Sequence, residues 1–471
     1  MGPFAARIVG ALVMVRRTVN DDAELINILN LRRYPYWGSL EKIFETILDD
    51  FSFGVPYSDL QSNATRIAND IDQFIQTECH GSDSFLRFEF IDSHFFQSAR
   101  AYLVGRIIMQ NDILPIVVAF KNEDIGIQVD AVLMSDREVS IVFGYTRSYY
   151  FANPNSVIGA VYFLHSIVPK KPIDELYTVL GRLRQGKTER YRTFTEHLYL
   201  TDDKFVHAAG DKGLVMIVFT LPSYDLVFKV IRDKFGYPKT LSRRDVINKY
   251  KLVSKHDRAG RLIDTQEFLN LKFPVDRFSD SLLDELLNEA SQSVKIEGNE
   301  LLIEHVYIER RVQPLNLYIN DATGNEAELA IIDYGQTIKD LAQTNIFPGD
   351  LLLKNFGVTR HNRVVFYDYD EVSLITECNF RDIPETDDSD DELRDDWYYV
   401  ADNDIFPEEF IKFLSLEKDL CTLFMTVHHD LMTADYWRSI KERQLAGEIS
   451  VVIPYFQPTL PTGRIQNKKS A

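Results

Sequence analysis

The sequence predicts an α+β chain in which a mainly helical domain, residues 1–203, precedes a bilobal domain, residues 204–471. Three observations support this prediction. The length of 471 residues exceeds what a single core usually organises. Helical periodicity dominates the first part, whereas β-branched and aromatic runs broken by glycines begin after residue 200. The sequence has no Pro/Gly-rich linker, so the boundary near residue 203 rests on the change of pattern alone.

The composition indicates a globular, acidic protein. Hydrophobic residues make up 45% of the chain, which is enough to build sizeable cores. Lys and Arg number 52 against 71 Asp and Glu, so the net charge is −19. A field of this sign repels polyanions, and nucleic acid is therefore not an expected partner.

The cysteines and the first residues indicate a cytoplasmic protein. Cys79, Cys378 and Cys421 are far apart and odd in number, without the paired spacing of a zinc site or a disulfide framework. The apolar run at residues 8–15 is much shorter than the roughly 20 residues that span a bilayer. We interpret it as helix core and expect neither a signal peptide nor a membrane association.

The first part of the chain contains no evident chemical motif. Residues 40–51 have helical periodicity, and VSIVFG at residues 139–144 is the clearest predicted strand. No phosphate loop, metal cluster or nucleophile constellation stands out in the sequence there. We therefore expect a scaffold, regulatory or docking domain.

The second part begins with a predicted hairpin. Residues 213–221 and 226–231 read as strands around a turn at residues 222–225. A helical stretch is predicted over residues 241–271, and LLIEHVYIE at residues 301–309 reads as a further strand. Strand, strand, helix, strand is the order of the small lobe of a protein kinase.

Two features of this lobe are candidates for nucleotide binding. The glycines of AAGDKG at residues 208–213 precede a strand, where backbone N–H groups can approach phosphates, but taken alone such glycines more often form a plain turn. Lys229 lies inside an apolar run, where an ammonium needs an anionic partner. VFKV resembles the kinase strand whose lysine binds phosphates and an acid from the neighbouring helix, although a lysine on an edge strand is the open alternative.

The strongest signal is a catalytic-loop pattern. Asp350 and Asn355 have the D-x-x-x-x-N spacing in which an aspartate accepts the proton of the substrate hydroxyl and an asparagine binds Mg²⁺. Asp368 follows at the end of an apolar strand, as the metal-binding aspartate of a kinase does. Lys354 lies inside the loop and is suited to neutralise a γ-phosphate, or it simply faces solvent. The order of these motifs predicts a protein-kinase-like domain.

Three other segments have simpler interpretations. His256, Asp257 and Arg258 contain the letters of a kinase motif without the following asparagine, so we interpret them as a polar helix face. His428 and His429 are adjacent and point to different helix faces, which favours a structural role over metal binding. The acidic segment at residues 385–396 is expected to be a solvated loop or a docking loop for a protein partner.

A longer resemblance covers residues 204–440. NIFPGD at residues 345–350 continues through LLLKNFGVTRHNRVVFYDYDEV to NFRDIP at residues 379–384, and this wording resembles the isocitrate dehydrogenase kinase/phosphatase family of bacteria. The segments around Lys229 (LVMIVFTLPSYDLVFKVIRDKF) and around Asp264 (HDRAGRLIDTQEF) agree with it. Before residue 204 the likeness is weaker, through AYLVGRII and SIVFGYTRSYY.

The resemblance implies a bifunctional enzyme that phosphorylates a serine of isocitrate dehydrogenase, directing carbon into the glyoxylate bypass, and that removes the same phosphate at one ATP site. The implied cofactors are ATP or ADP and Mg²⁺, with AMP as an allosteric effector. The implied N-terminal regulatory domain supports a homodimer and is shortened here relative to the family. The catalytic domain would comprise a small lobe, residues 204–310, and a large lobe, residues 311–471.

The resemblance also assigns roles by position. Asp350 would be the catalytic base, and Asp264 a functional acid on the small-lobe helix, associated with the phosphatase direction. Asn355 and Asp368 would hold Mg²⁺, with Asp370 as a further carboxylate near the metal. The nucleotide would be bound by Lys229 and a loop that consists of Ala208, Ala209, Gly210, Asp211, Lys212, Gly213 and Leu214.

Two alternatives remain open at this point. A kinase fold of this kind could transfer phosphate to a different acceptor, either another protein or a small alcohol. It could also bind nucleotide and dock to the dehydrogenase without turnover.

Overall fold

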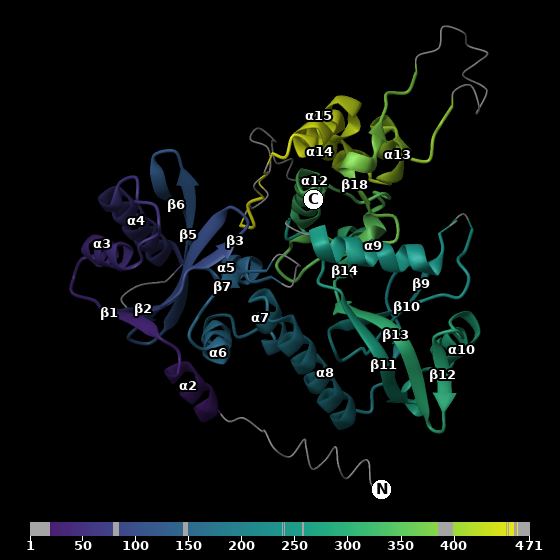
Figure 1. Cartoon of the computed structure of the whole chain (residues 1–471), viewed down its shortest axis with the longest axis horizontal. Coiled ribbons are helices and arrows are strands. Elements are labelled where there is room, and N and C mark those ends of the chain that lie inside the picture. Colours follow the sequence, from purple (N-terminus) through teal and green to yellow (C-terminus); the bar gives the residue numbers. More distant parts are fainter. Residues whose placement is uncertain are drawn as a thin grey trace, which may run out of the picture. The chain divides into compact units, whose positions relative to one another are not determined.

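The computed structural model divides the chain into two compact units. One unit comprises Met1–Thr201 and the other Asp202–Ala471 (Figure 1). The structure describes residues 19–78, 84–144, 149–237, 239, 241–256, 259–384, 399–448, 450, 452–455 and 459. Residues 8–15, Cys79, Asp257, Arg258 and the acidic segment 385–396 lie outside the described residues. Among the residues that are described, no helix combines the length and the apolar character that crossing a membrane requires.

The first unit is built on an antiparallel seven-stranded sheet. Its path runs β1-β2-β4-β3-β7, and β5 joins β4 to β6. The strands are β1 (Leu31–Pro35), β2 (Phe85–Ile91), β3 (Phe95–Gln97), β4 (Arg100–Met109), β5 (Ile113–Glu123), β6 (Gly126–Leu133) and β7 (Phe151–Ala152). Both faces are covered, because neighbouring residues of β4 such as Tyr102 and Leu103 point to opposite sides and are both buried.

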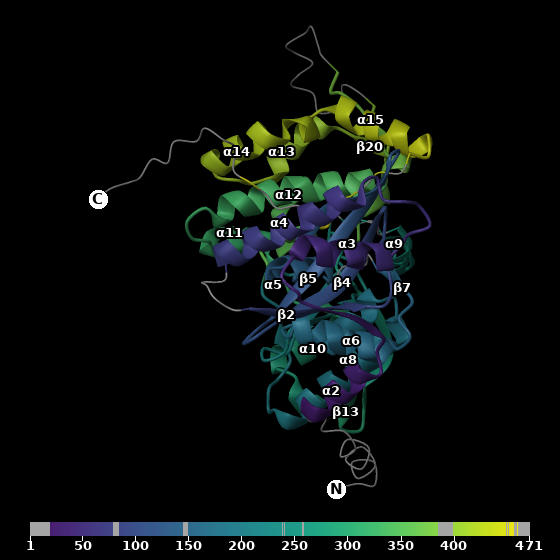
Figure 2. The ribbon, with the colours of Figure 1, turned by 90° about the vertical axis from the view of Figure 1, so that its left-hand side faces the viewer.

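Helices flank this sheet. They are α2 (Val19–Asn27), α3 (Leu40–Asp50), α4 (Leu60–Glu78), α5 (Asp136–Val142), α6 (Val157–Ile167), α7 (Ile173–Val179) and α8 (Leu183–Leu200). Helix α3 forms where helical periodicity predicts it and buries Ile43, Phe44 and Ile47 in one core with the strands. Figure 2 looks onto α3 and α4 from the side on which they cover the sheet.

The strand prediction at residues 139–144 is wrong. Residues 139–142 fall in α5, whose start is fixed by a capping box between Ser135 and Glu138, and Phe143 is its C-cap. A short apolar run cannot distinguish a buried strand from a buried helix by periodicity, and here the cap decides. Helical residues do outnumber strand residues in this unit, as predicted, but its seven-stranded sheet was not predicted.

The second unit begins with a six-stranded sheet in the order β11-β13-β10-β9-β8, with β12 beside β13. Its elements are β8 (Val206–His207), β9 (Met216–Thr220), β10 (Leu226–Ile231), α9 (Arg243–His256), β11 (Gln266–Pro274), η1 (Val275–Arg277), α10 (Asp280–Glu289), β12 (Val294–Glu297) and β13 (Glu300–Arg310). The predicted hairpin is confirmed as β9 and β10, and the predicted last strand as β13. The helix predicted over 241–271 is wrong in its second half, because α9 ends at His256 and β11 begins at Gln266.

The rest of the second unit is mainly helical, with small sheets. The helices are α11 (Leu315–Asp321), α12 (Glu326–Gln343), η2 (Leu353–Asn355), η3 (Ile375–Glu377), η4 (Pro407–Glu409), α13 (Phe410–Phe413), α14 (Lys418–His428), η5 (His429–Met432) and α15 (Ala434–Leu445). The strands are β14 (Gln313–Pro314), β15 (Ile346–Phe347), β16 (Phe356–Val358), β17 (Val364–Phe366), β18 (Ser373–Leu374), β19 (Asn379–Phe380) and β20 (Asp404–Ile405). In Figure 1, α9 lies between the six-stranded sheet and the helices α12, α14 and α15.

The structural interpretation of the histidine pair agrees with the packing. His428 is buried at the end of α14, and its Nε2 atom lies 2.9 Å from the Ile332 carbonyl oxygen. A Cβ atom at Gly335 would lie 2.3 Å from the His428 ring, so α12 and α14 approach closely at this point. His428 therefore joins two helices.

Candidate active site

The buried lysine of β10 has an anionic partner. Lys229 is 5% exposed, and its Nζ atom lies 2.5 Å from Oε1 of Glu309, which is 3% exposed. The same ammonium donates to the Tyr367 carbonyl oxygen at 2.8 Å. Lys229 is therefore no edge-strand lysine with its head in water, since β10 is paired on both sides.

The kinase pattern predicts that this acid comes from the neighbouring helix, but Glu309 comes from strand β13. In the antiparallel register Lys229 faces Tyr307 and Val227 faces Glu309. Glu309 is thus the diagonal neighbour of Lys229 on the same face of the sheet, within reach of a long side chain. No local pattern singles out Glu309, because its strand is apolar on both faces and also carries Glu304.

Glu309 links the lysine to the segment of Asp264. Its Oε2 atom accepts from the Thr265 hydroxyl at 2.9 Å, and Gln266 Nε2 donates to Asp264 Oδ2, also at 2.9 Å. Asp264 is buried and lies two residues before the start of β11, so its expected place on a helix is wrong. Neither Glu309 nor Thr265 is among the site residues predicted from the sequence.

A parallel bridge brings the Asp264 segment to the strand that precedes Asp368. Leu262 pairs with Phe366, the Phe366 N–H donates to the Arg261 carbonyl at 2.8 Å, and the Ile263 N–H donates to the Phe366 carbonyl at 3.3 Å. Asp264 and Asp368 each follow two residues after this bridge. Because the two bridged segments run parallel, Asp264 and Asp368 occupy equivalent positions just beyond the bridge.

A buried ion network holds this bridge in place. Arg261 is fully buried and contacts Asp333 at 2.8 Å and Asp340 at 2.7 Å, both on α12. It also donates to the Val364 carbonyl at 3.0 Å, while the Val364 N–H donates to Asp333 at 2.6 Å. Strand β17, which leads to Asp368, is therefore tied to α12 through charge-assisted hydrogen bonds.

The catalytic-loop pattern forms a compact turn. The Asp350 carboxylate accepts from the Leu352 N–H at 3.1 Å, and Asn355 Nδ2 donates to the Asp350 carbonyl at 3.3 Å. Gly349, at φ +83°, approaches Glu371 so closely that a Cβ atom would lie 2.6 Å from the Glu371 carbonyl oxygen. The loop is thus seated directly on the segment that carries Asp368 and Asp370. Burial raises the pKa of the Asp350 carboxyl above its usual range.

The predicted metal ligands fit a hard cation such as Mg²⁺. Asn355 uses its amide N–H group on the loop, which leaves its carbonyl oxygen for a ligand. Burial, followed by repulsion from Asp370, raises the pKa of Asp368 to about 7, so this carboxylate lacks sufficient compensating positive charge. Oxygen donors of this kind suit Mg²⁺. Across the described ranges, no three His, Cys, Asp or Glu side chains form a metal cluster, but the predicted set contains only two residues of these types, Asp368 and Asp370.

The predicted nucleotide loop contacts both α10 and the catalytic loop. Lys212 contacts Glu285 at 2.9 Å and Glu289 at 3.2 Å, both on α10. Asp211 lies 3.5 Å from the ammonium of Lys354, which is the predicted γ-phosphate ligand. Gly210 has φ +115°, and the Gly213 carbonyl accepts from the buried Arg232 at 3.0 Å. The loop therefore lies next to Lys354, while its own lysine is engaged with α10.

Lys239 also contacts the segment that carries the predicted metal ligands Asp368 and Asp370. Nothing in the sequence around Lys239 indicated this contact. Lys239 follows β10 and contacts Asp370 and Glu371, across more than a hundred residues of sequence. A contact between such distant residues leaves no local pattern.

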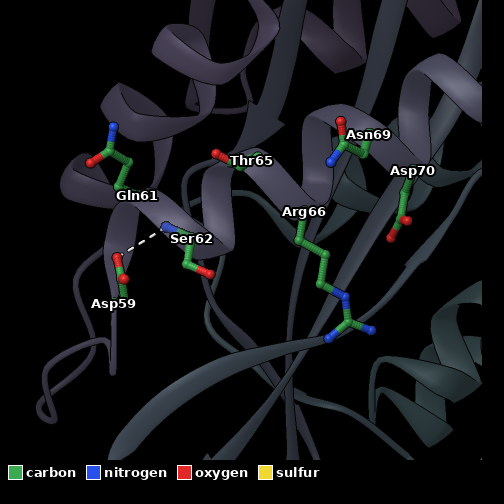
Figure 3. A pocket seen from close by; sticks show the side chains of 7 residues that line it. All are labelled: Asp59, Gln61, Ser62, Thr65, Arg66, Asn69 and Asp70. Atoms are coloured by element: carbon green, nitrogen blue, oxygen red, sulfur yellow. Dashed lines mark hydrogen bonds between the residues drawn. The ribbon is translucent and has the colours of Figure 1, made fainter.

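The cavity in Figure 3 belongs to the first unit and lies along α4. It is lined by polar side chains that already have structural roles. Asp59 caps α4 by accepting from the Ser62 N–H at 3.0 Å, and Arg66 donates to the Asp130 carbonyl at 2.8 Å. We assign no function to this cavity.

Comparisons with known proteins agree across both units. The model of the isocitrate dehydrogenase kinase/phosphatase (AceK) regulatory domain matches residues 10–202, and that of the kinase domain matches residues 203–457. The isocitrate dehydrogenase kinase/phosphatase of Anaeromyxobacter sp. (strain Fw109-5) is 46% identical, over 90% of this chain and 74% of the relative. That of Xanthomonas axonopodis pv. citri (strain 306) is 44% identical, over 89% and 72% respectively.

A solved structure described as "ROP18 kinase domain in complex with AMP-PNP and sucrose" covers 54% of this chain and 88% of that chain, at 10% identity and a TM-score of 0.26. This likeness is too low to support an argument. The family models and the relatives are sufficient by themselves: the chain belongs to the isocitrate dehydrogenase kinase/phosphatase family.

Proposed function

We propose that this protein is a bifunctional, ATP-dependent serine kinase and phosphatase that acts on isocitrate dehydrogenase at one nucleotide site. The observation that carries the proposal is the buried pair of Lys229 and Glu309, whose ammonium also binds the backbone directly before Asp368. The names of the relatives supply the protein substrate. Control of flux between the tricarboxylic acid cycle and the glyoxylate bypass would follow from this activity.

In the kinase direction the residues act mainly by position and charge. Lys229 would bind the nucleotide phosphates, and residues 208–214 would cover them. Asp350 would accept the proton of the serine hydroxyl, and Lys354 would neutralise charge on the transferring group. Asn355, Asp368 and Asp370 would hold Mg²⁺, which when bound supplies compensation for the charge that develops on the phosphoryl oxygens.

In the phosphatase direction we assign the distinguishing role to Asp264. Its burial beside the bridge to Phe366 supports this assignment, as does the chain of contacts from Thr265 through Glu309 to Lys229. A carboxylate held at this position could orient a water molecule against a phosphoserine. Both directions would then use the same lysine and the same metal ligands.

We assign residues 1–203 to regulation and residues 204–471 to catalysis, with small and large lobes at 204–310 and 311–471. Control by AMP and the homodimer stay predictions from the resemblance, and the cytoplasmic location stays a prediction from the cysteines and the first residues.

The direct test is incubation of the full chain with isocitrate dehydrogenase, Mg²⁺ and γ-labelled ATP. We expect label on a serine of the dehydrogenase and loss of its activity. When ATP is then removed and ADP is supplied, we expect release of the labelled phosphate. Label on a different acceptor would favour another phosphotransferase. ATP binding and dehydrogenase capture without any transfer would favour a docking protein, and either outcome would overturn the proposal.

A further inference from the structure

Three lysines of the second unit contact one short segment at successive points. Lys229 of β10 donates to the Tyr367 carbonyl at 2.8 Å, and Lys249 of α9 donates to the Val372 carbonyl at 2.5 Å. Lys239, midway between them in sequence, contacts the side chains of Asp370 and Glu371. The two outer lysines thus hold the backbone of residues 367–372, and the middle lysine neutralises Asp370 and Glu371.

The contact of Lys239 with Asp370 concerns a predicted metal ligand. Its Nζ atom lies 3.3 Å from Asp370 Oδ2, and its side chain is 16% exposed. An ammonium and a divalent cation repel each other at such a distance, and this repulsion is only partly screened where water is largely excluded. Lys239 and a metal ion on Asp370 therefore compete for the same carboxylate.

The position of Lys239 is coupled to the nucleotide loop. The Lys239 N–H donates to the Gly236 carbonyl at 3.0 Å, and the Gly236 N–H donates to the Leu214 carbonyl at 3.2 Å. Leu214 is the last residue of the predicted nucleotide loop. A rearrangement of that loop around phosphates would be transmitted to Lys239 through these two hydrogen bonds.

We propose that Lys239 is a tethered counter-ion that occupies the Asp370 carboxylate in the nucleotide-free protein and leaves it when the metal arrives with the nucleotide. This inference rests on the proposed function. Its consequence is ordered binding, because the free protein binds the divalent cation weakly and the metal–nucleotide complex binds well. Lys239 is therefore a positioning residue that sets when the metal can bind.

The test measures divalent-cation binding directly, with Mn²⁺ followed by electron paramagnetic resonance in full-length protein without nucleotide. Lys239→Met and Lys239→Gln are expected to bind Mn²⁺ roughly three- to tenfold more tightly than the unchanged protein, the order expected when one nearby competing charge is removed. Lys239→Arg should retain weak binding. In the presence of ADP the Mn²⁺ affinities of all variants should become similar. The nucleotide moves the competing positive charge away from Asp370 wherever residue 239 still carries one.

Lys272→Met is the matched control. It removes the same charge from the same lobe, at an exposed pair with Glu297 that is far from any predicted ligand in sequence, and it should leave Mn²⁺ affinity unchanged. If Lys239→Met and Lys239→Gln bind Mn²⁺ no more tightly than Lys272→Met, the inference is wrong. If Lys239→Met does not fold, Lys239→Gln and Lys239→Arg decide the question by the same comparison.

Asp368→Asn separates this inference from the proposed function. Loss of Mn²⁺ binding in Asp368→Asn, together with unchanged affinity in the Lys239 variants, would overturn the inference alone. Unchanged Mn²⁺ binding in Asp368→Asn would show that the metal site itself is elsewhere, and would overturn both the inference and the assignment of Asp368 as a metal ligand.

Discussion

Lys229 and Glu309 form a buried ion pair between adjacent strands, with Glu309 two residues beyond the position opposite Lys229. The ammonium and the carboxylate are both almost fully removed from water, so each depends on the other for compensation. The pair also has a third and a fourth participant, since Thr265 donates to Glu309 and Lys229 donates to the Tyr367 carbonyl. This arrangement connects the strand lysine with the segments of both Asp264 and Asp368.

Replacement of one partner should destabilise the protein strongly. Glu309→Gln keeps the shape of the side chain but leaves Lys229 buried without an opposite charge at its shortest contact, so the free energy of unfolding should fall by about 3 kcal/mol. Urea unfolding measures this change. Glu304→Gln in the same strand, where the partner Lys295 and Glu304 are both exposed, should lose less than about 1 kcal/mol. Equal losses in the two variants would contradict the importance of the buried pair.

Asp350→Ala should separate chemistry from binding. Without the proton acceptor, phosphate transfer to isocitrate dehydrogenase should fall by about 10²–10⁴-fold, the usual range for loss of a general base. ATP affinity should be largely retained, because Asp350 is not assigned to the phosphates. Single-turnover transfer and equilibrium nucleotide binding test the two parts. A variant that transfers phosphate at the original rate would exclude Asp350 as the base.

Gly349 should tolerate no side chain. Gly349→Ala places a Cβ atom 2.6 Å from the Glu371 carbonyl oxygen at a backbone position with φ +83°, so both strain and a steric clash are expected. We expect a loss of about 2–3 kcal/mol in unfolding free energy, together with reduced transfer because Asp350 is displaced. Gly298→Ala is the control, since Gly298 has φ +65° with nothing within 4 Å of the added atom. It should lose about 1 kcal/mol, from backbone strain alone.

His428 should make stability dependent on pH. Burial lowers the pKa of His428 to about 4, whereas in the unfolded chain it is about 6.5. Between these values the unfolded chain binds a proton that the folded protein does not, so stability decreases as pH falls through 6.5 towards 4. The difference between pH 7.5 and pH 5 should amount to roughly 2 kcal/mol.

The measurement is urea unfolding of the unchanged protein and of His428→Gln at pH 5, 6 and 7.5. Glutamine can donate to the Ile332 carbonyl but does not titrate, so the stability of this variant relative to the unchanged protein should rise as pH falls. A constant difference across the three pH values would show that His428 has an ordinary pKa.

The sequence alone could identify those parts of the protein whose signals are local. The β9–β10 hairpin follows from two alternating runs around a turn, and Lys229 is recognisable as a charge in an apolar strand. Asp350, Asn355 and Asp368 are close together in sequence, so their spacing is visible without a fold. Family membership follows from the same local sequence motifs, because the resemblance extends beyond the residues with a predicted chemical role.

Tertiary structure alone decided the partners of the site residues. The helix at residues 139–142 is a different case, because the capping box of Ser135 and Glu138 that starts it is a local sequence pattern. Glu309 replaces the expected helix acid because strand register, not sequence distance, brings it to Lys229. Lys239 meets Asp370 across more than a hundred residues. Such contacts depend on how distant segments pack, and periodicity reports only the local chain, so they became apparent only in the folded protein.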